Sequence, residues 1–430
     1  MKRIFLASVI ILLTLTSIAQ KTFTITEKKI IDQVHNNIPQ SFYLLKSLVD
    51  INSGTLNVQG VKKTGDILGN EFKKIGFTTE WIPMPESVKR AGHLVASIKG
   101  KKGQKLFLIG HLDTVFEPDS LGNNSYKILN DSTAGGQGVV DIKGGDVIIF
   151  TALQTLQQLG LLKNATITAY FTGDEENAGK PEEISRGDFI ERAKQHDVAL
   201  GYEGAKDLHE VATARRGAST WQLKVYGIQA HSAGIFKPGY GAIYEAARIL
   251  NSFREQLDTE KYLTFNPGLI AGGKEVFYDS AKLRSTISGK TNIIAPFTEV
   301  TGDLRFLTHA QKELARKHMQ NIVYTNNLPE THAEISFLDG IPAMEPAEKN
   351  DLLVSKLNEI CMALGTGEVH AGDPGSRGAG DISYIAKYVS AIDGLGAIGK
   401  GSHAPGETID IKNFRSLVER SALLIYRLTR

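Results

Sequence analysis

Short apolar runs alternate with helical patterns from about residue 30 to residue 250 of the chain. Four of the runs are nearly continuous, which predicts strands buried on both faces of a sheet. These runs occupy residues 93–98, 106–109, 165–171 and 198–201. Between the second and the third, residues 145–159 repeat apolar positions every three or four residues and stop at Gly160, which predicts a helix. This order of strands and helix predicts an α/β fold with a doubly wound, mostly parallel sheet.

The pattern changes after Arg216, where polar and apolar residues alternate along the sequence STWQLKVYG. Alternation with a period of two is typical of half-exposed antiparallel strands. Further alternating runs lie at residues 291–306 and 333–340, and a helical pattern lies at residues 240–257. We therefore expect residues 216–340 to form an inserted α+β domain with an antiparallel sheet and two helices. The flanking residues, 20–215 and 341–430, are expected to form the two parts of one catalytic domain.

The N-terminal residues 1–19 have the pattern of a secretory signal peptide. Lys2 and Arg3 precede an apolar run that ends near Leu15, and small residues lead up to Ala19, where cleavage is expected. The run is too short to cross a bilayer, and no later segment has the ~20 uninterrupted apolar residues that a span needs. We therefore expect an exported protein, periplasmic or secreted, with no membrane partner once the signal is removed.

Composition and charge exclude several classes of partner. The chain is 41% hydrophobic and 22% charged, which is ordinary for a soluble globular protein. The chain has 49 basic and 47 acidic residues, and removal of Lys2 and Arg3 with the signal leaves a net charge of zero. Nothing in this balance indicates nucleic acid or an anionic membrane as a partner. The single cysteine, Cys361, excludes a disulfide framework.

Acidic and histidine residues gather at the predicted strand ends and in two loops. They are His111 and Asp113 after the second strand, Asp141 in a glycine-rich turn, Glu175 and Glu176 after the third strand, Glu203 after the fourth, and His403 in a Gly/Pro loop. The carboxyl ends of parallel strands share one edge of a sheet, so we expect these side chains to meet. Two histidines and three carboxylates suit two borderline metal ions such as zinc, with Asp141 as the bridge. A remaining carboxylate can take a proton from a bound water, and Asp113 can hold the second ring nitrogen of His111.

Eight short motifs occur in the order found in the dinuclear zinc peptidases and deacylases. They are GHLDTV, GQGVVDIKGG, TGDEENAG, YEG, GIQAHSAG, TNIIAP, GDLRF and GSHAPGETIDI. Over about residues 40–430 the chain resembles this family, which includes glutamate carboxypeptidase, aminoacylase, acetylornithine deacetylase and succinyl-diaminopimelate desuccinylase. It is most similar in appearance to glutamate carboxypeptidase, which is also exported.

The resemblance implies two zinc ions per subunit, with cobalt able to substitute. One ion would be bound by His111 and Glu203, the other by Glu176 and His403, and Asp141 would bridge them. Glu175 would be the general base, and Asp113 would orient His111. The family also implies a cis peptide bond between Asp141 and Ile142.

The inserted domain resembles the dimerisation, or lid, domain of the family, and a homodimer is expected to form through it. His231 would then reach the active site of the other subunit and stabilise the oxyanion of the tetrahedral intermediate. Asn292 and Arg305 would hold the carboxylate of the substrate, for which a guanidinium offers a two-pronged donor. Arg377 is a further candidate for substrate binding, because its loop, GSRGAGD, replaces a stretch that is richer in glycine in glutamate carboxypeptidase.

These features predict a zinc-dependent hydrolase that cleaves an amide bond next to a free carboxylate, with a small peptide or an N-acyl amino acid as substrate. A glutamate-carboxypeptidase-like metallopeptidase is the first interpretation. An N-acyl amino acid deacylase and a di- or tripeptidase are the alternatives. Glu203 favours the carboxypeptidase and deacylase branches, because the aminopeptidases of the family tend to have Asp at this position. A remote alternative is a binding protein of the same fold that has lost its metals, although this sequence keeps every ligand position.

Overall fold

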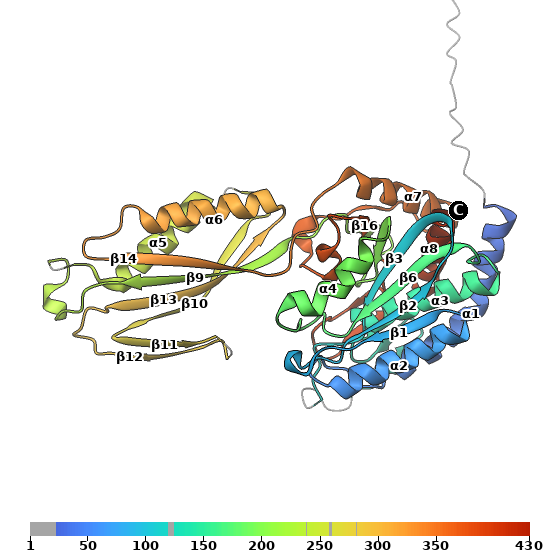
Figure 1. Cartoon of the computed structure of the whole chain (residues 1–430), viewed down its shortest axis with the longest axis horizontal. Helices are drawn as coiled ribbons and strands as arrows, with labels where there is room; N and C mark the ends of the chain where they lie inside the picture. The colour runs from blue at the N-terminus through green and yellow to red at the C-terminus, as the bar shows by residue number, and fades with distance from the viewer. Residues whose placement is uncertain (1–22, 119–123, 238, 258–259, 281) are drawn as a thin grey trace, which may run out of the picture.

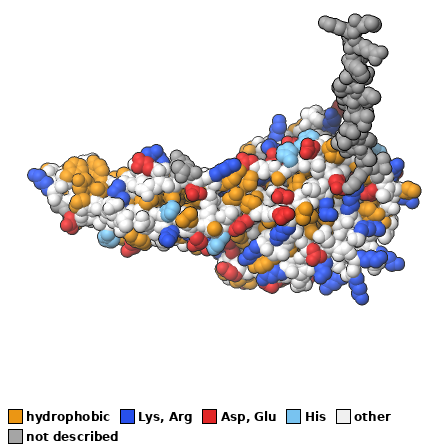
Figure 2. Space-filling model, turned by 90° about the horizontal axis from the view of Figure 1, so that it is seen from above, with side chains coloured by type: hydrophobic (Ala, Val, Ile, Leu, Met, Phe, Trp, Pro, Cys, Tyr) orange, Lys and Arg blue, Asp and Glu red, His pale blue; other side chains and the backbone are white. Residues whose placement is uncertain are grey.

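The computed structural model describes residues 23–118, 124–237, 239–257, 260–280 and 282–430. The predicted signal peptide lies outside these residues. Two main sheets, each with helices packed against it, give a mixed α/β architecture that is elongated along one axis (Figure 1 and Figure 2). Among the described residues, no helix is both long enough and apolar enough to cross a membrane.

The larger sheet has six strands in the order β1-β2-β6-β3-β7-β16. Their bounds are β1 (Thr78–Ile82), β2 (His93–Ile98), β3 (Lys102–His111), β6 (Ala165–Thr172), β7 (Val198–Gly201) and β16 (Ser390–Ile392). All four strands that the apolar runs predict are therefore present. The strands β6, β3, β7 and β16 run parallel to one another, whereas β1 and β2 are antiparallel to their neighbours.

The sheet is mostly parallel, as the sequence predicts, and the reversed direction of β2 is the departure from a fully parallel sheet. Its cause is the short connection between β2 and β3, which consists of residues 99–101. A crossover between two parallel strands needs a dozen or more residues, so β2 and β3 must run in opposite directions. The sheet is therefore mixed, and parallel pairing is confined to the part from β6 to β16.

Helices lie on both faces of the larger sheet. They are α1 (Ile25–Val49), α2 (Val58–Lys74), α3 (Gly144–Gln158), α4 (Glu182–Ala193), α7 (Glu348–Leu364) and α8 (Phe414–Leu428). On β3, Leu106 and Leu108 join the core that contains α1, α3 and α8, whereas Phe107 joins the core that contains α4. The start of α3 lies close to the end of β7, because a Cβ on Gly145 would be 2.2 Å from the carbonyl oxygen of Tyr202.

The smaller sheet has four antiparallel strands in the order β10-β13-β9-β14. Its elements are β9 (Gly217–Tyr226), α5 (Gly241–Leu257), β10 (Thr264–Gly273), β13 (Phe297–Phe306), α6 (His309–Tyr324) and β14 (His332–Asp339). The two helices cover one face, and a hairpin of β11 (Glu275–Asp279) and β12 (Arg284–Ser288) lies on the side away from them (Figure 1). Burial alternates along β9, as its sequence predicts, and Trp221 packs edge-on against Phe253 of α5. The segments that join the two sheets pair with each other through Arg215 and Met344.

A third sheet brings the C-terminal segment to the rim of the larger sheet. Its strands, in the order β17-β18-β5-β4, are β17 (Gly399–Lys400), β18 (Thr408–Asp410), β5 (Thr133–Gly135) and β4 (Lys127–Asn130). The strand β18 pairs with β5, which shortly precedes the turn that carries Asp141. The loop between β17 and β18, with His403, therefore lies beside that turn. Two further short strands, β8 (Glu210–Val211) and β15 (His370–Ala371), pair in parallel.

Candidate metal centre

Three neighbouring strands of the larger sheet end at one rim. His111, the last residue of β3, is paired with Thr172, the last residue of β6. Two residues earlier on β3, Ile109 is paired with Gly201, the last residue of β7. The residues that follow β6 and β7 therefore lie beside His111, in the arrangement that the sequence predicts.

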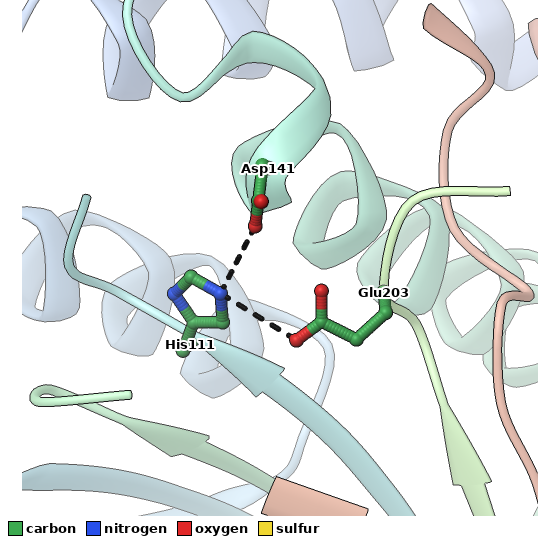
Figure 3. A group of neighbouring side chains, drawn as sticks. All are labelled: His111, Asp141 and Glu203. Carbon is green, nitrogen blue, oxygen red and sulfur yellow. Dashed lines mark ion pairs between the residues drawn. The ribbon is translucent and has the colours of Figure 1, made fainter. Parts of the chain in front are cut away.

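One candidate metal-binding group consists of His111, Asp141 and Glu203 (Figure 3). His111 Nε2 lies 3.3 Å from Asp141 Oδ1 and 3.6 Å from Glu203 Oε1. This nitrogen is buried and has no hydrogen-bond partner within the described ranges. Atoms that bind one tetrahedral zinc at ~2.0–2.1 Å lie about 3.3–3.4 Å from one another, so the spacing fits a shared metal ion.

A second candidate group, Asp141, Glu176 and His403, shares Asp141 with the first. His403 Nε2 lies 3.2 Å from Asp141 Oδ2 and 3.1 Å from Glu176 Oε2. Each carboxylate oxygen of Asp141 therefore faces a different histidine, which is the arrangement of a carboxylate that bridges two ions. The structure thus brings together the five residues that the sequence suggests as ligands, and it leaves Glu175 outside both groups.

The turn that carries Asp141 is held by Glu407, a residue for which sequence reasoning finds no role. Its carboxylate accepts hydrogen bonds from the backbone N–H groups of Gly138 (2.7 Å), Val140 (2.8 Å) and Asp141 (2.9 Å). The peptide bond between Asp141 and Ile142 is cis, as the family resemblance implies. Glu407 belongs to the motif GETIDI, but only the fold shows that three N–H groups converge on it.

Asp113 does more than the sequence suggests. The Nδ1 atom of His111 lies 3.1 Å from the backbone carbonyl oxygen of Asp113 and 3.4 Å from its carboxylate, so the closer contact is with the backbone. The carboxylate accepts hydrogen bonds from the N–H groups of Glu175 (3.0 Å) and Glu176 (3.1 Å) and from the hydroxyl of Thr55 (2.6 Å). Asp113 therefore connects the end of β3 to the loop after β6.

The site carries more negative than positive charge. Its carboxylates are those of Asp113, Asp141, Glu175, Glu176 and Glu203, and its imidazoles are those of His111 and His403. Burial and the nearby Asp141 raise the pKa of Glu203 to about 8, and burial and Glu203 raise the pKa of Glu175 well above its usual value. Hydrogen bonds to Asp141 and Glu176 raise the pKa of His403 to about 10. Each of these side chains keeps its proton to a higher pH than usual, and the cluster of carboxylates favours positive charge. Bound metal cations would supply that charge.

Within one chain, the predicted oxyanion residue His231 and the predicted substrate-binding residue Asn292 lie away from this centre. His231 belongs to the connection between β9 and α5, at the end of the smaller sheet that is farther from the larger sheet (Figure 1). Asn292 lies next to it, because its carbonyl accepts a hydrogen bond from the N–H of Ser232 (3.0 Å). No contact joins either residue to the metal centre among the interactions of the described residues.

The predicted pairing of Asn292 with Arg305 does not occur within one chain. Arg305 is paired with Ala218 near the start of β9, and its Nε donates to the carboxylate of Asp303 (2.7 Å). Asn292 lies beyond the opposite end of β13, a strand of 10 residues. A strand of that length spans about 30 Å, so the two side chains of one chain are too far apart to hold one carboxylate.

Arg377 lies beside the metal centre, but its guanidinium faces the protein. Its Nη1 donates to the carbonyl oxygen of Gly204 (2.7 Å), the residue after Glu203. Its Nη2 is buried, with no hydrogen-bond partner in the part of the chain that the structure describes. In this conformation only Nη1 of Arg377 is bound to the chain next to Glu203, and its role in substrate binding stays a prediction.

A mixed α/β sheet with two histidine–carboxylate groups sharing one aspartate at its rim is the arrangement of metal-dependent hydrolases. The chain belongs to peptidase family M20/M25/M40, since the model of this family matches residues 107–427. The protein is therefore an enzyme of a peptidase family, with a candidate metal-binding site at the expected rim.

Individual relatives agree with this assignment. Carboxypeptidase G2 of Pseudomonas sp. (strain RS-16) is 27% identical over 418 residues, which are 95% of this chain and 93% of that protein. Among solved structures, aminopeptidase PepT of Bacillus cereus ATCC 10987 is 16% identical with a TM-score of 0.71, covering 93% of this chain and 99% of its own. The YXEP protein of Bacillus subtilis, a dinuclear metal binding peptidase from the M20 family, is 14% identical with a TM-score of 0.65, covering 92% and 99%. These structures support the fold.

Proposed function

We propose that the protein is a zinc-dependent hydrolase that cleaves an amide bond next to a free carboxylate, as a glutamate-carboxypeptidase-like metallopeptidase. The observation that carries the proposal is the position of Asp141, whose two oxygens face two separate histidine–carboxylate pairs. His111 and Glu203 would hold one ion, and Glu176 and His403 would hold the other. Both sets offer only nitrogen and oxygen donors, which suit zinc and also cobalt.

Bound zinc would polarise the scissile carbonyl and lower the pKa of a water molecule. Glu175 belongs to neither ligand group, and Asp113 fixes its backbone N–H beside both. Its carboxylate is therefore available as general base. It takes one proton from the attacking water and gives that proton to the leaving nitrogen as the C–N bond breaks. The oxygen of the water stays on the new carboxylate, and the amine leaves.

A second copy of the chain would complete the site. His231 and Asn292 lie away from the metal centre of their own chain, which supports a role at the centre of another subunit. We propose a homodimer through the smaller sheet, in which His231 stabilises the oxyanion of the other subunit. Asn292 of one subunit and Arg305 of the other would then hold the substrate carboxylate, which resolves their separation within one chain.

Small peptides with a free C-terminal carboxylate are the first candidate substrates. Support comes from the similarity to carboxypeptidase G2 along nearly the whole chain. N-acyl amino acids and di- or tripeptides are the alternatives, and PepT, which shares the fold, is an aminopeptidase. The signal-like residues 1–19 support export to the periplasm or the medium, which N-terminal sequencing of the secreted protein tests by the presence or absence of a cut after Ala19.

Turnover by zinc-loaded protein is the direct test of this function. The panel contains dipeptides with C-terminal Glu, Asp or apolar residues, and N-acyl amino acids. Glu175→Gln is expected to bind two zinc ions but to turn over about 10²- to 10⁴-fold more slowly. Glu183→Gln, at an exposed position of α4, is the control and should match the wild type.

Three results would change the proposal. Near-normal turnover by Glu175→Gln with both ions bound would remove Glu175 as the base. Cleavage of N-acyl amino acids alone would select a deacylase. A wild-type protein that takes up no metal would favour a binding protein of the same fold.

A further inference from the structure

A buried arginine lies behind the loop that carries Glu175 and Glu176. Arg186, on α4, is only 1% exposed, and its guanidinium contacts two carboxylates. Its Nη1 lies 2.5 Å from Asp174 Oδ1, its Nη2 donates to the backbone carbonyl of Asp174 (3.1 Å), and its Nε donates to Asp381 Oδ1 (2.8 Å). A single cation therefore joins two acidic side chains that are far apart in sequence.

Asp174, near the start of the loop after β6, makes several contacts that hold this loop. Besides Arg186, its carboxylate accepts hydrogen bonds from the hydroxyl of Ser185 (2.6 Å) and from the N–H of Gly179 (2.8 Å). The loop is thus closed onto its own first residues and attached to α4. Since Glu175 is the next residue, its backbone position depends on these contacts.

Asp381 attaches the same arginine to the sheet. The second carboxylate oxygen of Asp381 accepts a hydrogen bond (2.6 Å) from the hydroxyl of Thr172, the last residue of β6. Arg186 is therefore held at a fixed distance from the strand end, and through Asp174 it holds the loop at that distance as well.

A histidine completes this arrangement. His93 is fully buried, and its Nδ1 accepts a hydrogen bond from the N–H of Gly173 (3.1 Å). Its Nε2 must then carry the proton, which it donates to the carbonyl of Ser185 (2.8 Å). The imidazole is neutral, in agreement with a pKa that burial lowers. The loop and α4 are therefore joined a second time, through a neutral group.

The loop after β6 supplies a ligand to one of the two candidate metal-binding groups and none to the other. It supplies Glu176 to the group with His403 and supplies the proposed base, Glu175. The other group draws His111 from β3 and Glu203 from the end of β7, strands whose register is fixed by sheet pairing. Displacement of the loop would therefore weaken one metal site and leave the other largely intact.

We propose that Arg186 is a positioning residue that fixes Glu175 and Glu176, so that the metal site of Glu176 and His403 depends on it while the site of His111 and Glu203 does not. This inference rests on the proposed dinuclear function. Arginine is required because its planar fork contacts Asp174 and Asp381 at once, whereas a lysine offers a single ammonium. A buried ion network often adds little net stability compared with apolar residues of similar size, so we assign Arg186 a role in positioning the loop.

The test compares Arg186→Lys with Arg192→Lys. Arg192 is a matched control on the same helix, because it too contacts two carboxylates, Asp188 (2.8 Å) and Glu80 (2.8 Å), but at the surface. Metal-free protein is titrated with Co²⁺ alone, and the visible absorption of the bound ion is followed. The wild type and Arg192→Lys should bind two ions. Arg186→Lys should bind one ion with unchanged affinity and the second about 10- to 100-fold more weakly.

Turnover provides a second readout, since kcat of Arg186→Lys should fall by about 10- to 100-fold with KM nearly unchanged. Equal weakening of both ions, or two ions bound as in the wild type, would overturn the inference. If Arg186→Lys fails to fold, Ser185→Ala removes one contact to Asp174 and should show the same selective loss to a smaller degree. A wild type that binds no Co²⁺ would instead refute the proposed function, so the two failures are distinguishable.

Discussion

The substitution Glu407→Gln tests how the turn that carries Asp141 is held. In the native protein, Glu407 Oε1 accepts hydrogen bonds from Val140 and Asp141, and Oε2 accepts one from Gly138. A glutamine keeps the two bonds on its oxygen, but its NH₂ group then faces the N–H of Gly138. Burial raises the pKa of Glu407 to about 7, so above that pH one charge-assisted hydrogen bond is replaced by a contact between two donors in a buried place.

The magnitude follows from that single loss. Removing the partner of a buried donor costs about 1–3 kcal/mol, and more where the lost partner was charged. We expect the free energy of unfolding of metal-free Glu407→Gln to fall by about 2–4 kcal/mol, measured by urea denaturation. Its zinc affinity should fall by about 10- to 100-fold in calorimetric titration, since Asp141 loses its fixed position.

A matched control is Glu345→Gln. Its carboxylate accepts one backbone N–H, that of His309 (2.8 Å), at an exposed position. This variant should stay within about 0.5 kcal/mol of the wild type. If Glu407→Gln has the stability and zinc affinity of the wild type, the turn is not held by Glu407 and the reasoning is refuted.

Three further predictions concern folding and assembly. His93 is neutral and buried, with a pKa that burial lowers, and it faces the charges of Asp174, Arg186 and Asp381. As the pH falls, His93 is therefore protonated at a higher pH in the unfolded chain than in the folded protein, so the free energy of unfolding should fall below about pH 6.5. His93→Gln should flatten this pH dependence in denaturation curves recorded at several pH values. An unchanged slope would contradict the assignment. Gly145→Ala should lower the free energy of unfolding by about 1–3 kcal/mol, because its Cβ would be 2.2 Å from the carbonyl oxygen of Tyr202. If the variant is instead more stable, as is usual for Gly→Ala within a helix, the structure relaxes around this contact and the prediction is wrong. Mixing inactive His231→Ala with inactive Glu175→Gln should restore up to about a quarter of wild-type activity, because mixed dimers contain one intact site; no recovery despite subunit exchange would exclude the shared site.

The ends of the parallel strands could be predicted because their signal is local. A continuous apolar run followed by His111, or by the triplet that contains Glu175 and Glu176, marks both a buried strand and its exit at the functional rim. The pairing of His111 with Thr172 then follows from the sheet alone. The cluster of five candidate ligands therefore required only the strand pattern, the glycine-rich turn and the motif order.

Contacts between distant segments could not be predicted in this way. The carboxylate of Glu407 meets a turn 269 residues earlier in the chain, and Arg186 meets Asp381 across 195 residues. A glutamate before a short strand and an arginine on a helix carry no sign of such partners, since both residue types are usually solvated. The direction of β2 was also hidden, because it depends on a short connection rather than on the pattern of the strand.

Crystals of the protein soaked in zinc would test the central claim most directly, through an anomalous difference map recorded at the zinc absorption edge. The account predicts two peaks about 3.5–4 Å apart, on either side of the Asp141 carboxylate. One peak should lie beside His111 and Glu203 and the other beside Glu176 and His403. A single peak, or peaks at other residues with this cluster unoccupied, would contradict a dinuclear centre bridged by Asp141.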